Sequence, residues 1–165
     1  MLRPQDIAVL LKLGRWTEER WTYAMLADEL ALSLSEAHSA VARLRKARLL
    51  IDGGPSRSAT MEFLVHGVRY AFATTPGGIT RGIPTAHAAP PLADVLAVDG
   101  PPPVWPAPEG RTRGEAIEPL YKKAPQAAMQ DEALYHALAL IDALRIGGAR
   151  ERKLAAELLE ELLFE

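Results

Sequence analysis

The stretch YAMLADELALSLSEAHSAVARLRKARLL, from Tyr23 to Leu50, predicts two short helices joined by a tight turn. Thr22 precedes the first helix as an N-cap, because its hydroxyl can accept a hydrogen bond from a free amide of the first turn. Leu26 and Leu30 are four residues apart, so they share one helical face with Tyr23. The turn is expected at residues 31–32.

The second helix of this stretch begins with the spacing of a capping box. Ser33 can accept from the amide of Glu36, and the carboxylate of Glu36 can reach back to the amide of Ser33. The helix is expected to run to about Ala47, with its apolar positions on the inner face. These inner positions are Ala37, Val41 and Leu44, whereas the expected outer face holds Ser35, Glu36, His38, Ser39, Ala42, Arg43 and Lys46.

The order of a Leu-Ala helix, a turn, a serine-capped helix and a basic end resembles winged helix-turn-helix transcriptional regulators of the MarR-like kind. The resemblance covers roughly residues 5–52, and it implies an α+β, mainly α fold with a recognition helix and a β-hairpin wing. One departure is Arg48, which stands where the pattern usually has a glycine. We therefore expect the end of the second helix to be built differently.

The residues upstream predict a supporting helix. Residues 3–13 place Ile7, Leu10 and Leu11 on one apolar face, and Gly14 is expected to end the helix. A connection follows from Arg15 to Trp21.

Downstream, residues 57–66 predict another helix that ends at Gly67. Residues 68–83 alternate around a Thr-Pro-Gly-Gly turn, and we interpret them as a β-hairpin wing. Alternatively, Leu49–Asp52 and Val68–Phe72 pair directly, and the intervening helix is an insertion.

The second half of the chain begins with an arm rich in proline. Nine of the thirteen prolines lie in residues 76–108, but interspersed apolar residues favour an arm that lies on the body, with a short helical turn in 91–97. Two amphipathic helices follow, 131–146 and 149–164, and we expect them to form an antiparallel hairpin.

Asp142 and Arg145 of the first C-terminal helix are expected to pair at the surface, with the charge of Arg145 in water. The resulting division is a winged helix-turn-helix DNA-binding domain over 1–83, a Pro-rich arm over 84–115 and a helical dimerisation or partner-binding region over 116–165.

Composition and charge restrict the functional classes. The chain of 165 residues contains no cysteine, which is consistent with a cytoplasmic protein, and it contains no apolar run of the ~18 residues that a membrane span needs. The net charge is −2, but residues 1–70 carry ten basic and eight acidic residues, so the acidic excess lies in the C-terminal half. This distribution favours a DNA-facing end and a protein-facing end.

The motifs therefore predict a DNA-binding transcription regulator, whose recognition helix enters the major groove of double-stranded DNA. The expected DNA-binding residues are Thr22, Tyr23, Ser35, Glu36, His38, Ser39, Arg43, Arg45 and Lys46, with Arg69, Thr80 and Arg81 from the wing. A homodimer through the C-terminal helices is expected to double the contacts.

The alternative is a winged-helix protein-interaction module, such as the partner or antitoxin of a two-component complex. The sequence predicts no catalytic residues, no metal site and no cofactor, because the four histidines lack paired spacing and no Gly-rich phosphate loop occurs. An enzyme is accordingly not expected.

Overall fold

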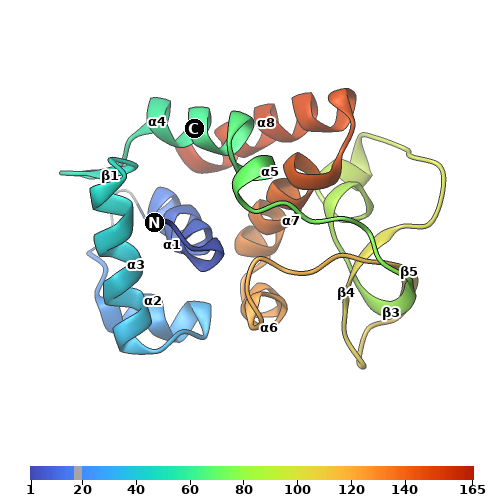
Figure 1. The fold of residues 1–165 in the computed structure, drawn as a ribbon, viewed down its shortest axis with the longest axis horizontal. Helices are drawn as coiled ribbons and strands as arrows, with labels where there is room; N and C mark the ends of the chain where they lie inside the picture. The colour runs from blue at the N-terminus through green and yellow to red at the C-terminus, as the bar shows by residue number, and fades with distance from the viewer. Residues whose placement is uncertain (17–19) are drawn as a thin grey trace.

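The computed structural model describes residues 1–16 and 20–165, and its fold is an α+β arrangement dominated by helices (Figure 1). The predicted connection from Arg15 to Trp21 contains residues 17–19, which lie outside the described residues.

Helix α1 (Pro4–Arg15) lies at the centre of the contacts between the N-terminal and C-terminal helices. Pro4 occupies the first turn, where a missing amide costs nothing, and every residue from Asp6 to Gly14 is buried. The helix contacts α3, α7, α8 and β2. The predicted stop at Gly14 is wrong: the helix continues to Arg15, and a Cβ at Gly14 would come within 3.3 Å of Leu163 Cδ2. Glycine therefore allows α8 to approach closely.

Helices α2 (Tyr23–Leu30) and α3 (Leu34–Lys46) confirm the two predicted helices and the tight turn between them. The hydroxyl of Thr22 accepts a hydrogen bond from the amide of Met25 at 3.1 Å, as expected of an N-cap. The turn begins at Ala31, whose φ of 54° places it in the left-handed region. Both helices pack on α1 and on each other.

A short antiparallel hairpin follows α3 directly, formed by β1 (Leu50–Ile51) and β2 (Gly54–Pro55). The end of α3 is indeed built differently, because Arg48 itself adopts a φ of 63° where glycine would be the usual residue. The alternative pairing of Leu49–Asp52 with Val68–Phe72 is wrong, since β1 pairs locally with β2.

Helix α4 (Arg57–His66) is confirmed, but the predicted wing over residues 68–83 is wrong. After Gly67 the chain forms a further helical turn, α5 (Val68–Ala71). Val68 and Phe72 are four residues apart, so the alternation that suggested a strand also places them on one helical face. That face packs towards α7, where Val68 is buried.

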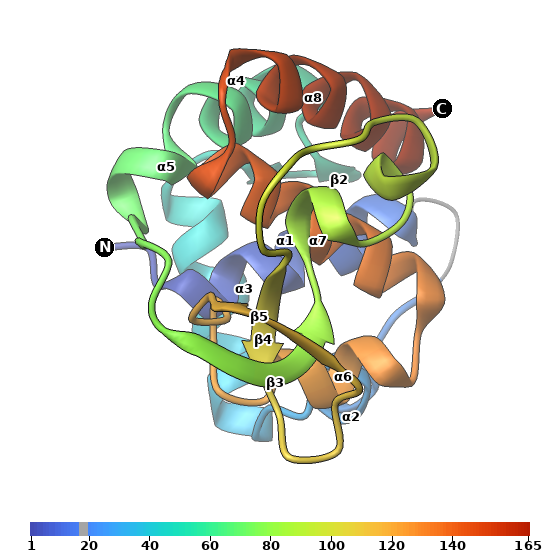
Figure 2. The same ribbon diagram turned by 90° about the vertical axis from the view of Figure 1, so that its right-hand side faces the viewer.

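The second half of the predicted hairpin and the Pro-rich segment form a small closed barrel (Figure 2). Strand β3 (Ile79–Pro84) runs antiparallel to both β4 (Pro103–Pro106) and β5 (Thr112–Ala116), which are parallel to each other. A Cβ at Gly82 would overlap the carbonyl oxygen of Trp105. Strand β3 covers the second half of the predicted hairpin, whereas β4 and β5 were not predicted: prolines occupy both ends of β4, and β5 is a short polar stretch around Gly114.

Between β3 and β4 the chain lies on the body, as expected of the Pro-rich arm. It forms two short 3-10 turns, η1 (Ala86–Ala88) and η2 (Leu92–Asp94), and the second confirms the helical turn predicted in 91–97. Leu92 is fully buried.

The C-terminal part comprises α6 (Ala124–Met129), α7 (Glu132–Ile146) and α8 (Ala149–Phe164). Helices α7 and α8 pack together, which confirms the predicted helical hairpin. The apolar face of α8 also contacts α1 and α4, so it is used within the chain. Dimerisation through α8 stays a prediction, and it would have to use the polar side of the helix.

An ion pair between Asp131 and Lys12 connects the N-terminus of α7 to α1. Asp131 caps α7 by accepting from the amide of Leu134 at 3.2 Å, and it also accepts from the ammonium group of Lys12, whose side chain is only 4% exposed. Burial acts to raise the pKa of Asp131, but the hydrogen bonds from Lys12 and Leu134 prevail and lower it.

The hydrophobic core runs continuously from Ile7 of α1 to Leu163 of α8, and it includes Leu92 and Trp105 of the Pro-rich segment. All three predicted regions of the chain therefore contribute to it. Among the described residues, no helix combines the length and the apolar character required to cross a membrane.

Candidate nucleic-acid interface

Helix α3 has one buried and one exposed side. The buried residues Ala37, Ala40, Val41 and Leu44 face α1 and α2. With 100° between successive residues, the opposite side is centred on a stripe of exposed residues. This stripe consists of Ser35, Ser39, Ala42 and Lys46.

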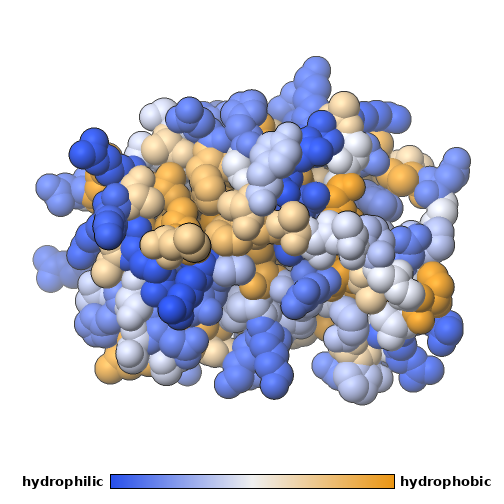
Figure 3. All heavy atoms as spheres, in the orientation of Figure 1, coloured by the Kyte–Doolittle hydropathy of each residue, from blue (hydrophilic) through white to orange (hydrophobic). Residues whose placement is uncertain are grey.

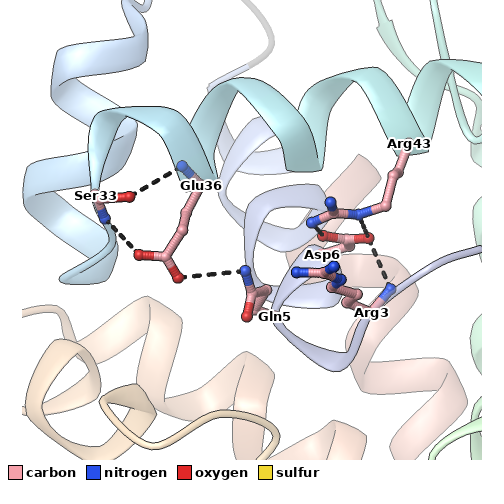
Figure 4. A network of polar contacts seen from close by, with 6 residues as sticks. All are labelled: Arg3, Gln5, Asp6, Ser33, Glu36 and Arg43. Atoms are coloured by element: carbon pink, nitrogen blue, oxygen red, sulfur yellow. Dashed lines mark hydrogen bonds and ion pairs between the residues drawn. The ribbon is translucent and has the colours of Figure 1, made fainter.

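The N-terminus of α3 has the predicted capping box. Glu36 N donates to Ser33 Oγ, and Ser33 N donates to Glu36 Oε1, each at 3.0 Å (Figure 4). The pKa of Glu36 is lowered, mainly by the hydrogen bond from the backbone of Ser33. Its other carboxylate oxygen lies 3.5 Å from Nε2 of Gln5 on α1. The carboxylate of Glu36 is therefore engaged by Ser33 and Gln5 on the side of α3 that faces α1, away from the central stripe.

Arg43 lies on the same flank as Glu36, and its expected outward orientation is wrong. Its guanidinium donates two hydrogen bonds to the carboxylate of Asp6, from Nε at 2.8 Å and from the second terminal nitrogen at 2.7 Å (Figure 4). The amide of Arg3 donates to the same carboxylate at 2.8 Å. Asp6 is completely buried and Arg43 is 18% exposed. This bidentate pair fastens α3 to α1.

The opposite flank of α3 carries an aromatic cluster. The ring of His38 stacks on Tyr23, with centroids 3.7 Å apart and planes inclined by 20°. Trp21 meets Tyr23 edge to face at 5.3 Å. Thr22 and Tyr23 therefore lie beside α3, as expected, although the hydroxyl of Thr22 is already used as a helix cap.

The C-terminal end of α3 is basic and exposed. Arg45, Lys46 and Arg48 all lie at the surface, and none forms an ion pair within the described residues. They precede the β1–β2 hairpin directly.

Three of the expected DNA contacts lie away from α3. Thr80 and Arg81 belong to β3, in the barrel at the opposite end of the long axis (Figure 1). Arg69 lies on α5, where its guanidinium stands 5.1 Å from the ring centroid of Tyr70. These residues do not converge with the stripe on α3.

Sequence reasoning missed two exposed apolar residues beside this surface. Leu34 is the first residue of α3, and Ile51 lies in the new hairpin; each is 54% exposed. The exposure of Leu34 could have been predicted from its position next to the Ser33 cap. A residue in the first turn, on the outer side of a helix, has no neighbouring element packed over it.

The predicted surface pair of Asp142 and Arg145 forms, but in the interior. Arg145 donates to Asp142 Oδ1 at 2.8 Å and to the carbonyl oxygens of Phe72 and Glu118, and its side chain is only 5% exposed. Thr85 Oγ1 and Trp105 Nε1 donate to Asp142 Oδ2 at 2.6 and 2.7 Å.

Burial raises the pKa of Asp142, against the opposing effect of the charge on Arg145. Thr85 follows β3 and Trp105 belongs to β4, whereas Asp142 belongs to α7. The network therefore ties the barrel to α7.

Within the described residues, no group of three or more His, Cys, Asp or Glu side chains could hold a metal ion. Comparison of the chain with protein families, with curated proteins and with solved structures found no match. The geometry of α3 and its surroundings is therefore the basis for a functional interpretation.

Proposed function

We propose that residues 4–55 form a winged helix-turn-helix that binds double-stranded DNA sequence-specifically, and that the protein is a transcription regulator. The observation that supports this most is the exposed stripe of α3, which leads into the basic end at Arg45–Arg48 and then into the β1–β2 hairpin. A helix held by its neighbours with one side free can enter the major groove.

The stripe supplies a modest set of base contacts. The hydroxyls of Ser35 and Ser39 can donate to or accept from base edges, and Ala42 and Leu34 can contact thymine methyl groups. His38 stands beside them, oriented by Tyr23. These side chains are sufficient to distinguish the bases at a few positions of a DNA site.

The basic end of α3 supplies phosphate contacts. Arg45, Lys46 and Arg48 are exposed, and the hairpin at residues 50–55 lies next to them as a minimal wing. Phosphate contacts position a protein on the duplex without reading its sequence. Arg43 is excluded from this role because Nε and Nη2 of its guanidinium both donate to the buried carboxylate of Asp6.

The test is fluorescence anisotropy with a random duplex at several salt concentrations. Phosphate contacts release counterions, so affinity must fall steeply as salt rises. Lys46→Ala is expected to reduce the salt slope by about 1, whereas Lys122→Ala, which removes an exposed lysine outside α3, leaves it unchanged. Ser39→Ala is expected to change sequence preference. Absence of binding at low salt would refute the proposal.

A second candidate function is a protein-interaction module on the same scaffold. It is favoured by apolar side chains that gather on the surface between α3 and α5, as Figure 3 shows for the face seen in Figure 1. Exposed apolar surface of this kind commonly marks a protein contact. Complex formation without any salt-dependent affinity for DNA would favour this candidate over the first.

A further inference from the structure

A pocket lined by α4, α5 and α8, with no residue of α3, carries several basic side chains. It lies between α4–α5 and the first turns of α8 and has a volume of about 420 Å³. The residues that give it its chemistry are His66, Arg69, Tyr70, Arg152, Lys153 and Glu157. Its size falls in the range of small-molecule sites.

The basic side chains of this pocket outnumber the acidic ones. Within the described part of the chain, His66, Arg69, Arg152 and Lys153 take part in no ion pair, and Glu157 is the carboxylate among the lining residues. Positive charges that converge from separate elements repel one another unless an anion joins them. The pocket therefore favours a ligand with more than one negative charge.

Both arginines of the pocket have a neighbour that orients their guanidinium groups. Arg152 donates to the carbonyl oxygen of Gly147 at 2.8 Å, which orients its guanidinium without changing its charge. The guanidinium of Arg69 lies over the ring of Tyr70, 5.1 Å from its centroid. Guanidinium groups fixed in this way suit the oxygens of a phosphate, which they can bind in a bidentate manner.

Tyr70 adds a different kind of surface. Its side chain is 74% exposed although it borders a pocket, and Arg69 covers part of one ring face. An exposed aromatic ring beside a cluster of cations can stack on a planar group of a ligand. The apolar part of the lining, which includes Val65 and Ala156, extends this surface.

We propose that this pocket binds a phosphate-bearing small molecule with a planar ring, of the nucleotide class. The cations hold the phosphate and Tyr70 stacks on the ring. The site is separate from the proposed DNA surface, because its lining comes from α4, α5 and α8. Binding of such a molecule does not depend on whether α3 binds DNA.

The test is isothermal titration calorimetry of the full chain with AMP, inorganic phosphate and adenosine. AMP is expected to bind most tightly, inorganic phosphate more weakly and adenosine not measurably. Lys153→Glu is expected to raise the Kd of AMP about tenfold or more, because it replaces an attractive charge by a repulsive one. Lys122→Glu makes the same change on an exposed lysine outside the pocket and serves as the control.

Tyr70→Ala separates the two parts of the site. It is expected to weaken the binding of AMP but not that of inorganic phosphate. Both Tyr70 and Lys153 are exposed, so their variants retain the fold, which circular dichroism checks.

The proposal is overturned by absence of AMP binding at millimolar concentration, by adenosine binding as tightly as AMP, or by an equal effect of Lys122→Glu. Competition by short random duplex DNA as strong, per phosphate, as that of AMP would also overturn it. That result would make the pocket a contact for the nucleic-acid backbone.

Discussion

Removal of the charge on Arg43 tests whether this residue fastens α3 to α1 or faces the solvent. Arg43→Met keeps most of the aliphatic side chain and removes both hydrogen bonds to Asp6. The matched control is Arg45→Met, the same change at an exposed position two residues further along α3.

The expected loss follows from the burial of the two partners. Breaking a buried ion pair costs about 3–5 kcal/mol, chiefly because the remaining charge is left without a partner. Asp6 is completely buried, but Arg43 is 18% exposed, so water screens part of the interaction. We therefore expect Arg43→Met to lower the free energy of unfolding by about 2–3 kcal/mol, and Arg45→Met to change it by less than about 0.5 kcal/mol.

Urea unfolding followed by tryptophan fluorescence measures the difference. With an m-value of about 2 kcal/mol/M, the midpoint of Arg43→Met should fall by about 1–1.5 M. Asp6→Asn in the Arg43→Met background should cost much less than in the wild type, because the buried charge is already unpaired. Equal midpoints for Arg43→Met and Arg45→Met would refute the assignment of Arg43 as a fastening residue.

Three further changes test other parts of the fold. Asp131→Asn is expected to lower the free energy of unfolding at neutral pH by about 1–3 kcal/mol, because buried Lys12 loses a carboxylate partner. Since the folded pKa of Asp131 is depressed, this difference should persist above about pH 4 and vanish as the pH falls through the folded pKa, which urea titrations at several pH values measure. Gly82→Ala is expected to cost about 3 kcal/mol or more by urea unfolding, because its Cβ would overlap backbone, while Gly78→Ala, with open space around it, changes stability by less than about 0.5 kcal/mol. Ala31→Gly should raise the midpoint by the equivalent of about 0.5–1 kcal/mol, because glycine relieves the left-handed backbone; a lower midpoint would contradict that reasoning.

Helical periodicity and capping residues were sufficient to predict the elements that support the site. The Thr22 and Ser33 caps and the apolar spacing of α3 involve residues within a few positions of one another, so the sequence displays them directly. The hairpin of α7 and α8 was predictable for the same reason. Local signals determine where a helix begins, and they also indicate its apolar side.

The orientation of Arg43 and the location of the wing depended on contacts between distant residues. Arg43 lies near the boundary between the inner and outer sides of α3, and its partner Asp6 is 37 positions away in the chain. The segment from Val68 fits both a strand and a helix over so short a length, and its packing on α7 favours the helix. The barrel strands contain prolines and close-packed glycines instead of an alternating pattern.

The complete burial of Asp6–Gly14 has a consequence for how the protein can respond to its surroundings. Helix α1 bears α3 on one side and contacts α7 and α8 on others, so these helices share one rigid support (Figure 1). A displacement of the C-terminal helices that moves α1 is expected to move α3 with it, because a close-packed interior absorbs little of such a shift. Among the described residues, α3 and the C-terminal helices are thus coupled through a single buried helix.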